Sequence, residues 1–285
     1  MKTYVKIILA IILIVVVSGG IIMFAKKSEK NKNNKSNEMQ NNTVKSGTVN
    51  DTSNNTSNNT IKNNTNENTT NSNSDYATKI NSYEEYAKKQ MAEPEEGETI
   101  AVIHVKNYGD ITVKFFDNVA PKAVENFITH AKDGYYDGVI FHRVINEFMI
   151  QGGDPLGTGY GGESIWGKGF EEEMSEEILP YRGSLCMASA GTGTSSIGSQ
   201  FFITQSHYDE RTAKILEQYN WPTELINMYK KYGGYMSLYQ GYTVFGQVID
   251  GMEVVDNIAK TKTDSKDKPL EDVVIEKIEV KEYKK

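Results

Sequence analysis

Residues 31–74 consist mainly of Asn, Ser and Thr, as in the run NNTSNNTIKNNTNENTTNSNS, and they offer almost no apolar side chain to bury. Without apolar burial, nothing offsets the conformational entropy that a chain loses when it becomes ordered. We therefore expect a disordered linker, which spans roughly 35–40 Å on average if it behaves as a flexible coil. The alternative is a low-complexity tract without a function. Either way, the hydrophobic core must lie outside this stretch.

A second unusual segment precedes the linker. Residues 7–25 read IILAIILIVVVSGGIIMFA, nineteen positions without a charge. At about 1.5 Å per residue, this length matches the hydrocarbon core of a bilayer. We predict a transmembrane segment or signal anchor within residues 1–30, with the rest of the chain on the extracytoplasmic side. The alternative is secretion after signal cleavage, but the nearest cleavage site, at residues 23–25, is poor.

Charge and cysteine content exclude several classes of function. The net charge is −7; residues 1–74 carry nine Lys against four acidic residues, so the remainder carries 22 basic and 34 acidic residues. Such an acidic domain argues against nucleic-acid binding. The single cysteine, Cys186, excludes an intramolecular disulfide, a multi-thiolate zinc cluster and a redox CxxC pair. The four histidines have no ligand spacing, so we expect no metal. The GxGxxG match at 157–162 follows Asp154-Pro155 and precedes no helical pattern, so we interpret it as a glycine loop.

The pattern of the remaining chain is mainly β. Apolar spacing over 75–91 predicts an amphipathic helix within a lead-in segment, 75–97. TIAVIHV and ITVKFF, joined by NYGD, predict a hairpin, and Pro121 opens a helical pattern that Gly134 ends. Six further β-rich runs follow, VIFHRVI and EFMIQGG among them, with a short helix at about 252–259. We predict an eight-stranded closed antiparallel β-barrel, capped by two helices, over residues 98–285.

Within these runs lies a group of unusual segments: FHRVINEFMIQGGDPLGTGYGG, GSLCMASAG, GSQFFIT and YTVFGQVIDGMEVVD. In order and in content they resemble the signature blocks of the cyclophilin family of peptidyl-prolyl cis/trans isomerases, over roughly residues 98–283. The family fold is an eight-stranded barrel capped by two helices, in agreement with the pattern. The resemblance implies a domain without a cofactor that acts on proline-containing polypeptides, and we expect this domain to be a monomer. It implies a catalytic Arg143 and a substrate groove formed by His142, Phe148, Met149, Gln151, Ala188, Ser189, Gln200, Phe202, Leu238 and Tyr242.

The expected chemistry explains these residue types. Rotation of a prolyl amide must overcome a barrier of about 18–20 kcal/mol. A guanidinium that never deprotonates can donate a hydrogen bond to the proline nitrogen as the amide twists, while apolar side chains hold the ring away from water. With the N-terminal anchor, we expect an isomerase that assists the folding of exported or surface proteins. The alternative is a membrane-tethered module that binds proline segments, as a chaperone does, without turnover.

Three departures from the family pattern concern the groove. Ser189 stands where Asn is usual, Ser237 where Trp or His is frequent, and Tyr242 where His is frequent. The loop 192–197 is longer than its common form. An insertion at about 206–237 has helix-like spacing and borders the groove. We therefore expect weak binding of cyclosporin-like drugs, with isomerisation less affected.

Overall fold

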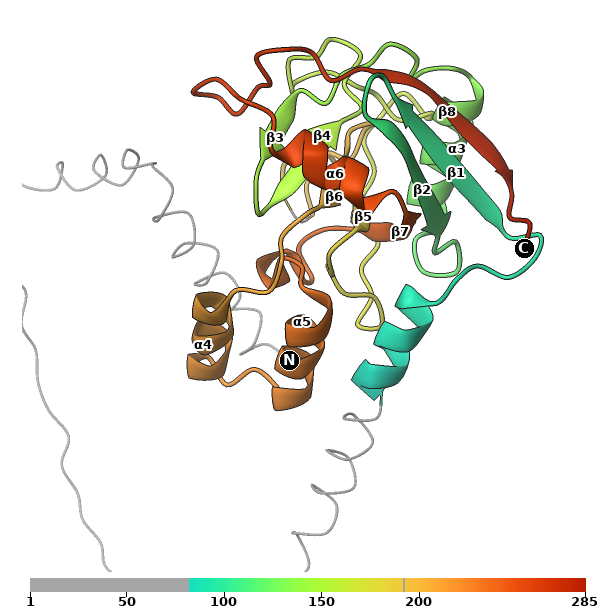
Figure 1. Ribbon diagram of the computed structural model, residues 1–285. Helices are drawn as coiled ribbons and strands as arrows, with labels where there is room; N and C mark the ends of the chain where they lie inside the picture. The colour runs from blue at the N-terminus through green and yellow to red at the C-terminus, as the bar shows by residue number, and fades with distance from the viewer. Residues whose placement is uncertain (1–81, 192) are drawn as a thin grey trace, which may run out of the picture. The chain divides into compact units, whose positions relative to one another are not determined.

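The computed structural model describes residues 82–191 and 193–285 (Figure 1). The predicted anchor, the predicted linker and the first part of the predicted lead-in helix lie outside these residues. Within the described part of the chain, no helix combines the length and the apolar character needed to cross a membrane. A helix over residues 82–91 opens the described part.

The fold is built on one antiparallel sheet of eight strands, in the order β3-β4-β6-β5-β7-β2-β1-β8. The mainly β prediction is confirmed, and the predicted hairpin forms β1 and β2. The strands are β1 (Thr99–Val105), β2 (Gly109–Phe115), β3 (Arg143–Ile145), β4 (Met149–Gly152), β5 (Ser184–Met187), β6 (Phe201–Thr204), β7 (Val244–Asp250) and β8 (Ile275–Glu282).

The sheet curls into a half-barrel whose edge strands are β3 and β8. The strand predicted for VIFHRVI is shorter than expected, because its first half pairs with the segment before β8 instead of continuing β3. Phe141 donates its N–H to the Val273 carbonyl (2.9 Å), and Ile140 forms an isolated bridge with Val274. These few backbone contacts join the two edges in place of the continuous ladder that a closed barrel would have.

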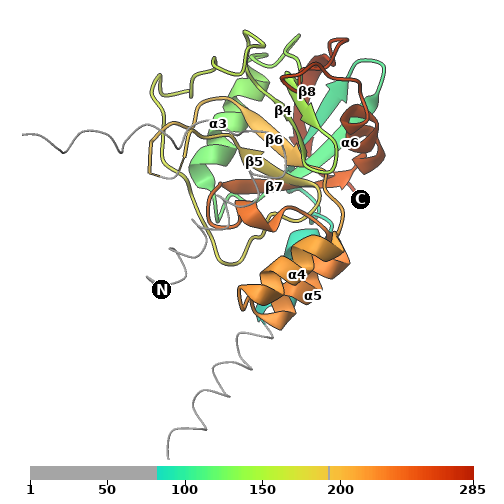
Figure 2. The same cartoon turned by 90° about the vertical axis from the view of Figure 1, so that its left-hand side faces the viewer.

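Two helices cover the interior of the curled sheet from opposite sides, α3 (Pro121–Lys132) and α6 (Met252–Ala259) (Figure 2). Apolar residues of both helices join the main core with the inward side chains of the strands. Phe127 of α3 lies at its centre, with ring contacts to Phe201 (5.2 Å between centroids) and Phe245 (5.4 Å). As the sequence predicts, Pro121 lies in the first turn of α3. The Glu173 carboxylate accepts hydrogen bonds from the free N–H groups of that turn.

The remaining helices pack together beside the sheet. In the predicted insertion, α4 (Glu210–Gln218) and α5 (Thr223–Tyr232) lie side by side, and a short 3-10 turn, η2 (Met236–Leu238), follows (Figures 1 and 2). With the helix over 82–91 they enclose a second hydrophobic cluster, which we call the insertion cluster. Its buried members are Ala87, Leu179, Tyr181, Ala213, Leu216, Leu225, Ile226, Tyr229 and Met236.

Candidate active site

Five neighbouring strands place one residue each in a row across the sheet. Cross-strand pairing runs from Arg143 (β3) to Gln151 (β4), then to Phe202 (β6), Cys186 (β5) and Val244 (β7). Side chains alternate between the two faces of a strand. The row therefore lies opposite the main core, to which the intervening residues of these strands belong. The register thus brings a cation, an amide and an apolar floor onto one face.

The floor of this face is a third hydrophobic cluster, which we call the groove cluster. Met149, Phe202 and Leu238 are at most 6% exposed within it. Phe202 meets the Tyr242 ring edge to face, with 5.6 Å between centroids. Its buried members are Phe116, Met149, Cys186, Phe202, Leu238 and Val244, and the half-buried Val119, Ile145, Phe148, Ile178, Ala188, Tyr235 and Tyr242 surround them. This cluster offers a dry surface on which an apolar ring can rest.

Arg143 lies at the edge of the floor, in the first position of β3. Its side chain is 41% exposed, and its Nε lies 3.5 Å from Oδ2 of Asp267. An ion pair this exposed contributes little free energy, so the guanidinium keeps donors for another partner. Burial raises the pKa of the Tyr242 hydroxyl, and the charge of Arg143 opposes that rise, which places the cation within electrostatic reach of Tyr242.

The two predicted groove glutamines form a chain of amides. Gln151 Nε2 donates to Gln200 Oε1 (2.9 Å), and Gln200 Nε2 donates to the carbonyls of Gly159 (3.0 Å) and Gly161 (2.8 Å). The amide hydrogens of Gln200 are thus committed to the glycine loop, although the family resemblance implied that both glutamines line the substrate groove. Gln200 therefore positions the loop and Gln151.

The glycine loop itself is organised around a buried carboxylate. Asp154 is 0% exposed and accepts backbone N–H groups from Leu156, Thr158, Gly159 and Gly161 at 2.7–3.2 Å. Burial alone would raise the pKa of Asp154, but these four hydrogen bonds outweigh it and lower the pKa. Residues 163–183, which follow the loop directly, contain no helix. The interpretation of the GxGxxG match as a glycine loop is confirmed.

Three other predicted residues lie around the groove rather than on its floor. His142 is 6% exposed, and neither ring nitrogen has a hydrogen-bond partner among residues 82–191 and 193–285. Its ring lies beneath Gly159, where an added Cβ would be 3.5 Å from it. Ala188 donates its N–H to the Gln200 carbonyl (3.0 Å), and the buried Ser189 hydroxyl has no hydrogen-bond partner within the described part of the chain. His142 thus supports the glycine loop from below.

The predicted groove residues leave out seven members of the groove cluster, among them Cys186, Phe116 and Tyr235. Cys186 is 0% exposed and lies in the floor itself. Its alternation with Leu185 and Met187 was the signal that placed it on the groove face. Phe116, which follows β2, carried no such signal. Tyr235 comes from the insertion and meets Phe148, with 4.3 Å between ring centroids.

Comparisons with known proteins agree with this geometry. The family model for cyclophilin type peptidyl-prolyl cis-trans isomerase/CLD matches residues 100–280. The chain belongs to the cyclophilin family. A Staphylococcus aureus (strain USA300) protein, whose name places it among the peptidyl-prolyl cis-trans isomerases, is 52% identical over 191 residues, 67% of this chain and 95% of its own length. A Staphylococcus epidermidis protein so named is 51% identical over the same shares. The chain is therefore a cyclophilin-type peptidyl-prolyl cis-trans isomerase.

Solved structures show the same cyclophilin fold. A Cryptosporidium parvum cyclophilin-type isomerase is 35% identical, with a TM-score of 0.53, and covers 64% of this chain and 97% of its own. A second crystal structure of that protein was determined in the presence of the dipeptide Ala-Pro; it is 36% identical, with a TM-score of 0.51, and covers 63% of this chain and 96% of its own.

Proposed function

We propose that this cyclophilin isomerises Xaa-Pro bonds on the groove cluster, with Arg143 as the catalytic donor. The observation that supports the proposal is the cross-strand row, in which Arg143 of β3 and Phe202 of β6 both pair with Gln151 of β4, and Phe202 belongs to the apolar floor. The dipeptide Ala-Pro accompanies a related cyclophilin, which supports a proline-containing ligand here.

The chemistry requires no covalent step. The proline ring rests on Met149, Phe202 and Leu238, which exclude water from the amide. As the C–N bond twists, its nitrogen loses resonance and becomes a hydrogen-bond acceptor. Arg143 donates to that nitrogen only in the twisted state, so the contact lowers the barrier instead of stabilising the ground state.

Replacement of Arg143 tests this assignment in the full-length chain. Loss of one donor to a transition state costs roughly a hundredfold to a thousandfold in rate, and we expect that fall in kcat/KM for Arg143→Ala. Arg143→Lys keeps the positive charge but loses the planar guanidinium, so its kcat/KM should lie between those of the parent and of Arg143→Ala. Arg211→Ala, which removes an exposed arginine of α4, is the matched control. An Arg143→Ala rate within twofold of the parent would refute the role of Arg143.

We also propose that the enzyme acts as a monomer outside the cell membrane, assisting the folding of exported or surface proteins. The support is the uncharged run at 7–25 followed by the Asn/Ser/Thr-rich stretch at 31–74. Protease added to intact cells should then cleave within the Asn/Ser/Thr-rich stretch and release a domain with isomerase activity. Protection of the domain until the cells are lysed would place it inside and contradict the proposal.

A further inference from the structure

The turn η2 lies between the groove cluster and the insertion cluster. Tyr235 and Leu238 belong to the groove cluster, whereas Met236 and Tyr239 belong to the insertion cluster. Side chains three residues apart lie on the same side of a 3-10 turn. One side of η2 therefore faces the groove cluster, and the other faces the insertion cluster. The packing of the insertion thus determines where Tyr235 and Leu238 lie at the groove.

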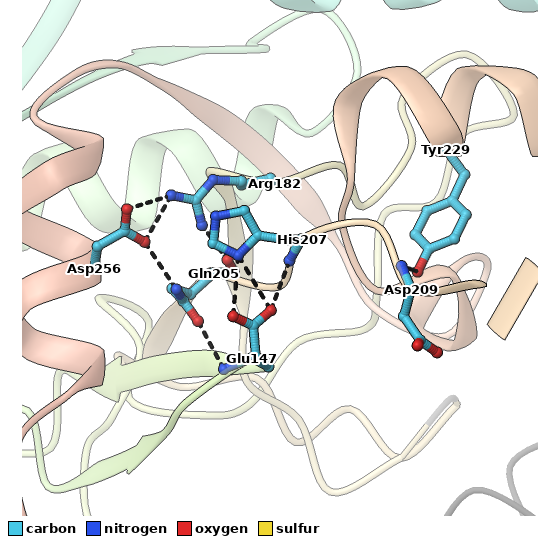
Figure 3. Close-up of polar contacts among 7 residues, drawn as sticks. All are labelled: Glu147, Arg182, Gln205, His207, Asp209, Tyr229 and Asp256. Carbon is cyan, nitrogen blue, oxygen red and sulfur yellow. Dashed lines mark hydrogen bonds and ion pairs between the residues drawn. The ribbon is translucent and has the colours of Figure 1, made fainter. Parts of the chain in front are cut away.

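The start of the insertion is bound to the turn that precedes Phe148. The Glu147 carboxylate accepts the backbone N–H of His207 (3.0 Å) and lies 3.0 Å from its Nδ1 (Figure 3). Gln205 accepts the N–H of Glu147 (2.8 Å) and donates to Asp256 of α6 (2.8 Å), which also pairs with Arg182. This network joins the β3–β4 turn, α6 and the first residues of the insertion.

The end of the insertion is also bound to the rest of the domain, near Pro180. Gly233 and Gly234 both have positive φ angles, +67° and +108°. A Cβ on Gly234 would lie 2.5 Å from the Cα of Tyr181 and against the Pro180 carbonyl, so only glycine allows this approach. Tyr235 then donates its N–H to the Pro180 carbonyl (3.0 Å). The backbone of Tyr235 is thus positioned before η2 begins.

The ring of Tyr235 meets the ring of Phe148 at 4.3 Å between centroids, with the planes tilted by 43°. The backbone of Phe148 is also held, because its carbonyl accepts the N–H of Gln205 (2.8 Å). Both rings are half-buried, so each keeps a surface open to solvent at the border of the groove cluster. Two positioned aromatic rings with open faces form a wall that a substrate side chain can contact.

We propose that Tyr235 is a specificity-determining residue: with Phe148 it binds the side chain next to the substrate proline, favouring aromatic and large aliphatic neighbours over small ones. This inference rests on the proposed groove. A Leu or Phe side chain buries more apolar area against these two rings than an Ala side chain does. We expect about a fivefold to tenfold preference in kcat/KM, which is about 1–1.4 kcal/mol at 1.4 kcal/mol per factor of ten.

The test compares short peptides in which the residue before or after the proline is Ala, Leu or Phe, with the full-length chain. We expect the parent to prefer Leu and Phe over Ala about fivefold to tenfold in at least one series. Tyr235→Ala should abolish that preference, and Tyr235→Phe, which keeps the ring, should retain it. Tyr232→Ala is the matched control, because Tyr232 packs on Tyr181 in the insertion cluster (5.3 Å) away from the groove. It should lower the melting temperature and leave the preference unchanged.

Two results would overturn the proposal. One is a parent without a preference; the other is a Tyr235→Ala variant that loses the same factor on every peptide, since Tyr235 would then only support Phe148. Tyr235→Leu, which keeps an apolar side chain of intermediate size, provides a folded variant if Tyr235→Ala is unstable; it should show a reduced preference. Failure of the groove itself is distinguishable, because Arg143→Ala would then leave all rates unchanged whatever Tyr235 does.

Discussion

Replacing Gln90 by alanine tests whether the helix over 82–91 is an integral part of the isomerase domain. Gln90 is 0% exposed. Its Nε2 donates to the carbonyl of Leu179 (2.7 Å) and to Oε1 of Gln247 (3.1 Å), and its Oε1 accepts the N–H of Leu179 (3.0 Å). The amide thus joins the helix to the segment before β5 and to β7.

The free-energy cost follows from what remains unpaired in Gln90→Ala. The Leu179 carbonyl keeps the N–H of Tyr181 (2.8 Å), and Gln247 Oε1 keeps the Ser184 hydroxyl (3.3 Å). Of these groups, only the buried N–H of Leu179 loses its partner, at a cost of about 1–3 kcal/mol. The lost methylene adds about 1 kcal/mol. We expect the free energy of unfolding to fall by about 2–4 kcal/mol, or roughly 4–16 °C in melting temperature for a domain of this size.

Urea and thermal unfolding of the full-length chain, followed by near-UV circular dichroism, measure this change. Lys88→Ala is the matched control in the same helix, because Lys88 is exposed and forms an ion pair with the exposed Glu84 (3.0 Å). It should change the free energy of unfolding by less than about 0.5 kcal/mol. A Gln90→Ala effect as small as that of Lys88→Ala would refute the docking of this helix.

Two further predictions follow from buried titratable groups. Burial raises the pKa of the Cys186 thiol, so a thiol reagent should label it only after unfolding; rapid labelling of the folded chain would show that the groove floor opens. Burial also lowers the pKa of His142, against the opposing charge of Asp154. The unfolded chain therefore binds a proton first as the pH falls below about 6.5, and the folded state loses stability from there downward. His142→Asn should lose less stability than the parent between pH 6.5 and 5. Part of the dependence of stability on pH should remain in the variant, because the pKa of His130 is lowered too. Parallel pH profiles of parent and variant, measured by thermal unfolding, would contradict this account.

Sequence patterns correctly predicted the elements that depend on residues close together in the chain. The β1–β2 hairpin follows from alternation and an Asn/Gly turn, and α3 follows from Pro121 and helical spacing. The resemblance to the cyclophilins named Arg143, Gln151 and Phe202, and the strand register places them in one row. Such patterns can be recognised in the sequence because they depend on residue spacing along one strand or helix.

Other features depend on contacts between distant residues, and no local pattern reports them. Gln200 donates to Gly159 and Gly161, about forty residues earlier in the chain, so its amide is committed in a way that strand alternation does not reveal. Tyr235 contacts Phe148 from an insertion whose two ends are bound to the distant residues Glu147 and Pro180. The first half of VIFHRVI has the composition of a strand, but its pairing partner near Val274 makes it a connection between sheet edges.

The central claim is that prolyl bonds isomerise on the groove beside Arg143, and exchange NMR tests it most directly. A peptide containing Ala-Pro is held at equilibrium with a small amount of the full-length chain, and the cis–trans exchange rate is measured from exchange cross peaks. We predict fast exchange with the parent and with Arg211→Ala, and near-background exchange with Arg143→Ala. Equal exchange with the parent and with Arg143→Ala would contradict the account.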